Sequence, residues 1–222
     1  MLRYVLPVVF AAVTAHAQWA GFRAPGVPRL KDGTPNLSAK APRVNGKPDL
    51  SGVWHVHPSK LSDFQRHFGP DFKDDNNPVG MGLDSISVYG VDVFADLEFG
   101  KAPMTPAGAA IFGKRFPDGP EQLPSTFCLP MHTMGAMLLT ELIKIVPSPG
   151  VTMILHEFNN DYRQIYTDGR KLPTDPWPAT LGYSIGHWDG DTFVVESNGF
   201  KDRGWLDVLG HPSSESLKTI ER

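Results

Sequence analysis

The chain has 222 residues and a formal net charge of −3, from 21 lysine and arginine residues against 24 aspartate and glutamate residues. The basic residues form no run, which argues against nucleic acid or an anionic membrane as a partner. Cys128 is the only cysteine, so an internal disulfide is excluded and the core has to be stable without one.

The amino-terminal residues follow the pattern of a secretory signal peptide. Arg3 supplies a positive charge, Val5 to Val13 form a short apolar run, and Ala15-His16-Ala17 provides a small-x-small cleavage site. We therefore expect residues 1–17 to be removed and the protein to be exported, to the periplasm or the extracellular space. The apolar run is too short to cross a bilayer and no later stretch is longer, so we do not expect a membrane-spanning protein.

The remaining chain divides into a proline-rich arm and one domain. Residues 18–48 are rich in Pro, Gly, Lys, Arg and Ala and have no hydrophobic period, which predicts an extended arm or linker. Residues 49–222 are predicted to form a single β-rich domain. Within it, Thr105 followed by Pro106 marks the start of one short helix that ends near Phe116, and Ser87 to Phe94 is predicted to contain a strand.

Short strands separated by turn residues dominate the second half of the chain. The predicted strands are Leu139–Val146, Val151–Phe158, Tyr162–Tyr166, Tyr183–Trp188, Asp191–Ser197 and a last one within Glu215–Arg222. This spacing predicts a mostly β fold, an antiparallel meander that forms a curled sheet or a calycin-like barrel with long irregular loops.

The central hairpin has the clearest local signal. Asp189 and Gly190 both tolerate positive φ, so they predict a two-residue type I′ turn. This turn sets the register of the hairpin, in which Trp188 lies opposite Asp191, Gly186 opposite Phe193 and Tyr183 opposite Glu196. Apolar side chains lie on both faces of this hairpin, which predicts that both faces are covered.

Several segments of the domain form a recognisable pattern: KIVPSPG, VTMILHEFNNDYRQIYTDGRKLP, LGYSIGHWDGDTFVVESNGFKDRGWLD and GHPSSESLKTIER, with DLSGVW further upstream. Through them the run from Ile143 to Arg222 resembles a family of exported, β-rich bacterial proteins of unassigned function. The resemblance implies a secreted β domain and no particular activity. Members usually continue past the position of Glu221 into another hairpin, so it also implies a sheet truncated at this end.

Polar side chains in the strands give the first candidate site. Arg163 and Tyr166 lie on opposite faces of one regular strand, so only one of them can point inward. An inward Arg163 needs a carboxylate or an anionic ligand, because a lone buried charge is very costly. Tyr183 and Glu196 either line the interior, with Glu196 as a desolvated acid, or form an ordinary cross-strand pair on the surface.

The loop that follows the central hairpin gives the second candidate site. It brings together acidic, basic, aromatic and imidazole side chains, namely Asp202, Arg203, Trp205 and His211. Such a set can bind a polar ligand or transfer protons. The alternative is a loop that ion pairs hold in place.

Binding of a small, partly apolar ligand inside the barrel is the leading hypothesis for function. The predicted ligand-binding residues are Arg163, Tyr166, Tyr183, Arg203 and Trp205. One alternative is a secreted enzyme that performs acid–base chemistry on a small molecule, with the predicted catalytic residues His211, Asp202 and Glu196. Another is a protein that uses its proline-rich arm to bind a second exported protein.

The sequence predicts no cofactor and no metal site. His55 and His57 lie on one face of a predicted strand, a spacing at which two imidazoles can share a metal. A zinc site needs at least a third protein ligand. Nothing in the sequence brings one to this pair, so we expect no bound metal there.

Overall fold

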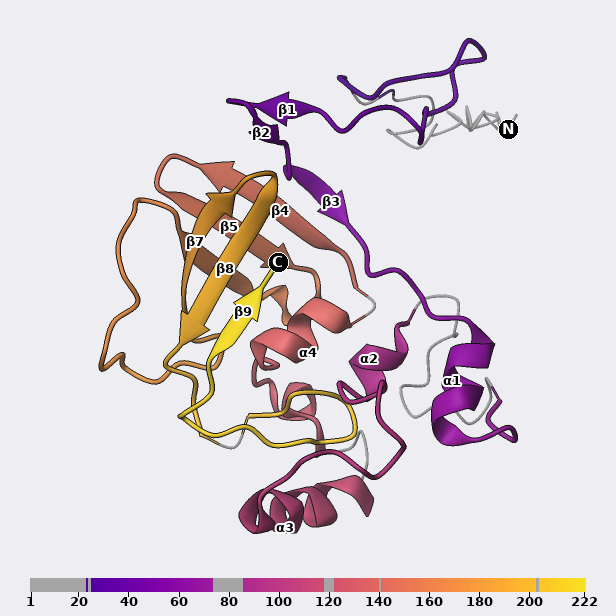
Figure 1. Cartoon of the computed structure of the whole chain (residues 1–222), viewed down its shortest axis with the longest axis vertical. Coiled ribbons are helices and arrows are strands. Elements are labelled where there is room, and N and C mark those ends of the chain that lie inside the picture. Colours follow the sequence, from indigo (N-terminus) through magenta and orange to yellow (C-terminus); the bar gives the residue numbers. More distant parts are fainter. Residues whose placement is uncertain (1–22, 24, 74–85, 118–121, 140, 203) are drawn as a thin grey trace, which may run out of the picture. The chain divides into compact units, whose positions relative to one another are not determined.

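The computed structural model describes residues 23, 25–73, 86–117, 122–139, 141–202 and 204–222 (Figure 1). The predicted signal peptide, residues 1–17, lies outside the described residues. The chain divides into two units, residues 1–42 and 43–222. The predicted arm crosses this boundary, because residues 43–48 contribute strands β1 (Arg43–Val44) and β2 (Lys47–Pro48) to the second unit.

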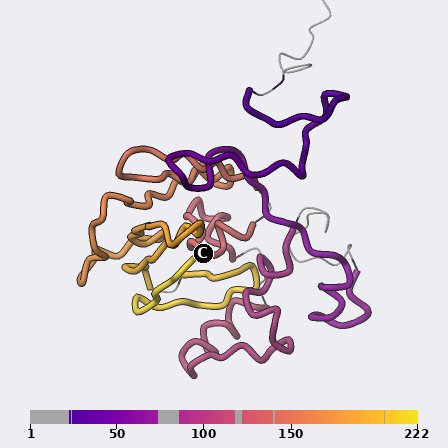
Figure 2. The backbone as a smooth tube through the Cα atoms, turned by 45° about the horizontal axis from the view of Figure 1, so that its top comes forward, coloured from indigo at the N-terminus to yellow at the C-terminus, as the bar shows by residue number. Residues whose placement is uncertain are grey.

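A seven-stranded sheet forms the body of the second unit (Figures 1 and 2). Neighbouring strands follow the order of the sequence: β3 (Gly52–Trp54), β4 (Ile143–Ser148), β5 (Val151–His156), β6 (Tyr162–Tyr166), β7 (Tyr183–Asp189), β8 (Thr192–Asn198) and β9 (Thr219–Glu221). The sheet curls into a half-barrel, which confirms the predicted mostly β fold. One pair departs from a strict meander: β6 and β7 run parallel, and residues 167–182 form the connection between them.

The β7–β8 hairpin corrects the predicted turn. Asp189 pairs with Thr192, so the two loop residues are Gly190 and Asp191. Gly190 has φ +57°, and Asp191 is not among the residues with positive φ. Positive φ at the first loop position alone is the pattern of a type II′ turn, which requires glycine there. The predicted type I′ turn is therefore wrong.

The register of the hairpin changes with the turn. Tyr183 lies opposite Asn198 and Gly186 opposite Val195, so the predicted partners of both residues are wrong by two positions. A shift of two residues leaves every side chain on its predicted face, because the side-chain period of a strand is two. Trp188, Phe193 and Val195 consequently still share one face, as predicted.

The two faces of the sheet differ in what they bury. We call the face that carries Ile154, Ile165 and Val195 the inner face, and the opposite one the outer face. These three residues form a core cluster, against which Met137 of helix α4 (Thr133–Leu138) packs. Burial along β6 follows the strand period, with Arg163 and Ile165 buried and Tyr162 and Gln164 exposed.

Short helices and loops surround the sheet. They are α1 (Leu61–Phe68), α2 (Val88–Val91), α3 (Pro106–Arg115), α4 and the 3-10 helices Pro124–Phe127 and Phe158–Asn160. Helix α3 confirms the predicted helix, and the Thr105 hydroxyl accepts a hydrogen bond from the Gly108 amide as its N-cap. None of the described helices has the length and apolarity that crossing a membrane would need.

Helix α2 stands where a strand was predicted. The Ser87 hydroxyl accepts a hydrogen bond from the Tyr89 amide and caps the helix. A Cβ atom added at Gly90 would lie 2.4 Å from the Leu138 carbonyl oxygen, so glycine is what allows α2 to approach α4 this closely. Tertiary packing therefore overrides the β-branched character of this segment.

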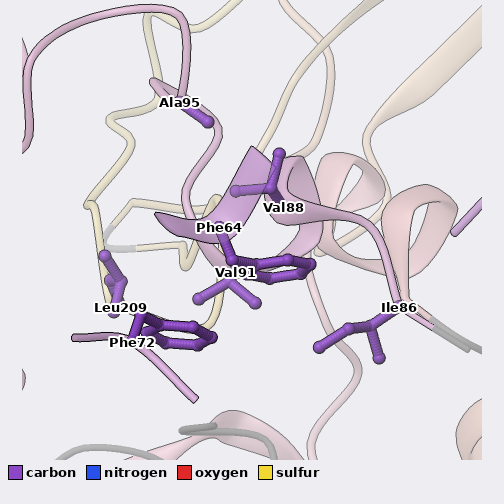
Figure 3. Close-up of a cluster of buried hydrophobic side chains, with 7 residues drawn as sticks. All are labelled: Phe64, Phe72, Ile86, Val88, Val91, Ala95 and Leu209. Atoms are coloured by element: carbon purple, nitrogen blue, oxygen red, sulfur yellow. The ribbon is translucent and has the colours of Figure 1, made fainter. Parts of the chain in front are cut away.

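A second core lies among the helices (Figure 3). It is formed by Phe64 of α1, Val88 and Val91 of α2, and Leu209 of the loop before β9, together with Phe72, Ile86 and Ala95. The amides of Val208 and Leu209 donate hydrogen bonds to the carbonyls of Gly90 and Val91. The loop before β9 is thus fixed to α2, more than 100 residues earlier in the chain.

Candidate functional site

A cavity of about 400 Å³ lies against the inner face of the sheet. It is touched by β4, β5, β6, β8 and β9, so the sheet curls round it. Its walls are mostly apolar: Leu50, Met137, Ile145, Ile154, Ile165, Phe193 and Val195, with Thr152, Asp191, Thr192, Glu221 and Arg222 as polar groups. A second cavity of about 370 Å³, beside the β1–β2 hairpin, shares Leu50, Thr152 and Phe193 with it. The two cavities therefore adjoin along the inner face.

Arg163 belongs to a buried polar network on the inner face. Its side chain is 2 % exposed and donates two hydrogen bonds to the Glu221 carboxylate, at 2.8 and 2.6 Å. It also donates to the hydroxyls of Ser184 at 3.1 Å and Ser197 at 2.8 Å. The structure thus supplies the carboxylate that an inward arginine needs, and the ion pair cancels the charge beside the cavity.

A buried histidine lies near the same guanidinium. His132 is 1 % exposed and packs its ring against Phe200, at 4.5 Å between ring centres. Burial, and after it the positive charge of Arg163, lower the pKa of His132 to about 4. Neither ring nitrogen has a hydrogen-bond partner among the described residues. His132 is therefore a neutral imidazole at physiological pH.

Tyr166 and Tyr183, both predicted ligand-binding residues, lie on the outer face. Their rings stack at 5.2 Å between centres. The guanidinium of Arg170 lies 3.8 Å from the Tyr166 ring and donates a hydrogen bond to the Tyr183 hydroxyl. Asp168 forms an ion pair with Arg170, and that ion pair together with the hydrogen bond to Tyr183 raises the pKa of Arg170. Both tyrosines are half-buried and line, together with Arg163, a cavity of about 340 Å³ that is distinct from the inner cavity.

The predicted pairing of Tyr183 with Glu196 is not realised. Glu196 lies opposite Ile185 and Ile220 on the outer face of the sheet, where it is half-buried. The cause is the type II′ turn, which shifts the register by two residues. Glu196 therefore does not line the inner cavity.

The loop before β9 holds the other predicted site residues. His211 and Asp202 both line a cavity of about 460 Å³, together with Thr105, Ser213 and apolar residues of α3 and of the segment before it. Trp205 is buried, with the Arg115 guanidinium 4.8 Å from its ring. Arg203 lies outside the described residues. Of the three predicted catalytic residues, the structure brings His211 and Asp202 to one cavity and leaves Glu196 out.

His211 has partners that the sequence did not predict. Its Nδ1 atom is 2.6 Å from the Asp207 carboxylate and 3.8 Å from the Asp92 carboxylate. Asp92 in turn is 2.8 Å from Nε2 of His67. The i,i+4 spacing of Asp207 and His211 was the one available sequence signal. His67 and Asp92 lie in a stretch without periodicity, where nothing pointed to a shared site.

The histidine pair considered as a metal site lies at the surface. His55 and His57 are both exposed, and the His57 ring contacts the carbonyl of Pro58. Among the described residues, the one group of metal-ligating side chains that converges is Asp92, Asp207 and His211, which does not include this pair.

Comparisons with known proteins identify no relative of this chain. No family model, no curated protein and no solved structure matches the chain. The family resemblance therefore stays a prediction from the quoted segments.

Proposed function

We propose that this is an exported protein that binds a small, neutral, mostly apolar molecule on the inner face of its curled sheet. The observation that carries the proposal is the cavity of about 400 Å³ whose apolar walls come from four strands, helix α4 and Leu50. Cavities of this size and composition are the usual form of small-molecule sites. Export, and membership of the family that the sequence resembles, belong to the same proposal and rest on the signal-peptide pattern and the quoted segments.

The polar groups at the cavity favour a neutral ligand. Glu221 and Asp191 are the carboxylates at the cavity, and Arg163 and Arg43 respectively already form ion pairs with them. A ligand cation would have to compete with a guanidinium, and a ligand anion would meet the carboxylate. The Thr152 hydroxyl and the remaining lone pairs of Glu221 can each accept one hydrogen bond. An apolar body with a single hydroxyl or amide donor fits these groups.

Binding of the neutral fluorescent probe N-phenyl-1-naphthylamine tests the proposal. We expect saturable binding with a Kd on the order of 10 µM, which corresponds to about −7 kcal/mol. Ile145→Phe should weaken binding at least several-fold, because the larger side chain enters the cavity. Val146→Phe is the matched control, since Val146 is the next residue of β4 and its side chain is on the outer face, opposite Met153.

The outcomes separate cleanly when both variants retain the circular dichroism spectrum and the melting transition of the wild type. Saturable binding that Ile145→Phe reduces and Val146→Phe leaves unchanged supports the inner cavity. Equal binding by all three proteins would overturn it. If Ile145→Phe does not fold, Thr152→Val removes the hydroxyl at nearly constant volume, and a probe that carries a hydroxyl group should then bind more weakly.

A further inference from the structure

Four ionisable side chains from three distant parts of the chain meet in the interior of the helical region. His67 comes from α1, Asp92 follows α2 directly, and Asp207 and His211 belong to the loop before β9. Their exposed fractions are 7, 3, 0 and 3 %. They adjoin the hydrophobic cluster of Figure 3, to which Phe64, Val91 and Leu209 contribute beside them. This cluster is separate from the inner cavity and plays no part in the function proposed above.

The ligand atoms of this group are close enough to share one ion. One carboxylate oxygen each of Asp92 and Asp207 and one nitrogen of His211 all lie within 4.8 Å of one another. In a tetrahedral zinc site with bonds near 2.1 Å, neighbouring ligand atoms are about 3.4 Å apart. The 2.6 Å hydrogen bond between Asp207 and His211 would widen by less than 1 Å, and the 3.8 Å gap to Asp92 would narrow slightly.

The backbone holds the two carboxylates in place independently of the histidines. The amides of Gly210 and His211 donate to one oxygen of Asp207, at 3.0 and 3.1 Å, and the Val93 amide donates to the other at 3.0 Å. The Phe94 amide donates to Asp92 at 2.8 Å. Both carboxylates would therefore keep their orientation if a metal ion took the place of the proton on Nδ1 of His211.

Aromatic rings fix the imidazole of His211. Phe112 of α3 stacks on it at 4.4 Å and Phe94 meets it edge-on at 5.0 Å, both between ring centres. His67 donates its Nε2 proton to the Asp92 carboxylate and so orients it. Groups of this kind, which hold a ligand rather than bind the ion, are a regular part of metal sites.

The charge of the group calls for a cation. Two carboxylates buried side by side are very costly unless positive charge lies between them. Backbone amides are dipoles and cannot cancel a net charge of −2. One divalent ion between the carboxylates would cancel that charge.

We propose that Asp92, Asp207 and His211 bind a divalent transition-metal ion, with His67 as the residue that positions Asp92. Two carboxylate oxygens and one imidazole nitrogen suit zinc or manganese, whereas calcium takes six to eight oxygens. Of the three ligands, His211 also lines the cavity of about 460 Å³. The proposal differs from the prediction that no metal binds, because that prediction considered His55 and His57.

Calorimetric titration of the chelator-treated full-length protein with zinc chloride tests the site, with manganese and calcium chloride run in parallel. We expect one equivalent of zinc to bind, a higher melting temperature with zinc, and weak or absent binding of calcium. Asp92→Asn and His211→Gln should each weaken zinc binding at least 100-fold. His67→Gln should weaken it roughly tenfold, the lower end of the usual effect of a positioning residue. His55→Gln should leave it unchanged.

Each other outcome counts against the metal. If zinc produces no saturable heat, the group is a buried hydrogen-bonded network that binds no metal. If zinc binds but only His55→Gln removes it, the ion sits on the exposed histidine pair as an adventitious ion only. Should Asp92→Asn fail to fold, the zinc affinities of His67→Gln and His55→Gln, each compared with that of the wild type, still decide between the two sites.

Discussion

At the scale of single residues, burial changes the acid–base behaviour of His132. Its pKa is lowered from 6.5 to about 4, by burial first and then by Arg163. The unfolded chain therefore binds a proton on this residue at a higher pH than the folded chain does. Stability is unaffected above pH 6.5, is lost progressively as the pH falls from 6.5 to 4, and does not change further below that on account of this group.

We expect His132→Leu to reduce the acid sensitivity of the fold. A shift of this size corresponds to about 3 kcal/mol between pH 7 and pH 4, and the variant lacks that part of the loss. Urea unfolding at both pH values measures it. His187→Leu, at an exposed position of β7, is the control and should keep the wild-type pH dependence. His156, whose pKa burial also lowers, leaves a smaller dependence of the same sign in His132→Leu.

At the scale of elements, the hairpin shows what a local pattern can and cannot predict. The face of every side chain followed from alternation alone, whereas three of the four strand bounds differ from the prediction by one residue. The turn type did not, because Gly190 suits the second position of a type I′ turn and the first position of a type II′ turn equally well. The ladder with β9, in which Val195 pairs with Glu221, lies outside any local pattern.

Gly186 is a case where the prediction reached the right contact through the wrong partner. Phe193 was expected directly opposite Gly186, and Val195 stands there instead. A Cβ atom at Gly186 would nevertheless lie 2.5 Å from Cζ of Phe193 and 2.8 Å from Cγ2 of Ile165. The missing side chain makes room for the Phe193 ring on the diagonal of the ladder, within reach of an aromatic side chain.

Two alanine variants distinguish the observed turn from the predicted one. Gly190→Ala should cost about 1 kcal/mol, because its φ of +57° is unfavourable for a residue with a Cβ atom. Asp189→Ala should lie within about 0.5 kcal/mol of the wild type, since Asp189 is exposed and part of the strand. In a type I′ turn both positions would have positive φ, and thermal melts would then show the two losses to be similar.

At the scale of the whole molecule, the curled sheet was predictable and the meeting of its distant parts was not. Arg163 was expected to need a carboxylate if it pointed inward, because a lone buried charge is costly. That requirement follows from one residue alone. That Glu221, 58 residues later, would supply it depends on how β9 docks. The same holds for His67 of α1, Asp92 at the end of α2 and His211 of the loop before β9, which only the packing of these elements brings together. Sequence patterns report local periodicity, whereas these sites arise from contacts between elements.

The Arg163 network joins four strands across the inner face. The guanidinium of β6 contacts the hydroxyls of β7 and β8 and the carboxylate of β9, so it ties the last strand to the middle of the sheet. Glu221→Gln leaves the buried guanidinium without its counter-charge. We expect a loss of about 3 kcal/mol, the lower end of the range for breaking a buried pair, because Glu221 itself is one-third exposed.

A double variant decides whether this loss is a property of the pair or of the carboxylate alone. Replacing both charges, in Arg163→Met/Glu221→Met, removes the unpaired charge and should be less destabilising than Glu221→Gln alone. Glu196→Gln, at a carboxylate on the outer face, is the control and should cost under about 0.5 kcal/mol. Urea unfolding of the four proteins supplies the free energies. If the double variant is less stable than Glu221→Gln, the attraction within the ion pair, rather than the avoidance of a lone charge, holds β9 to the sheet.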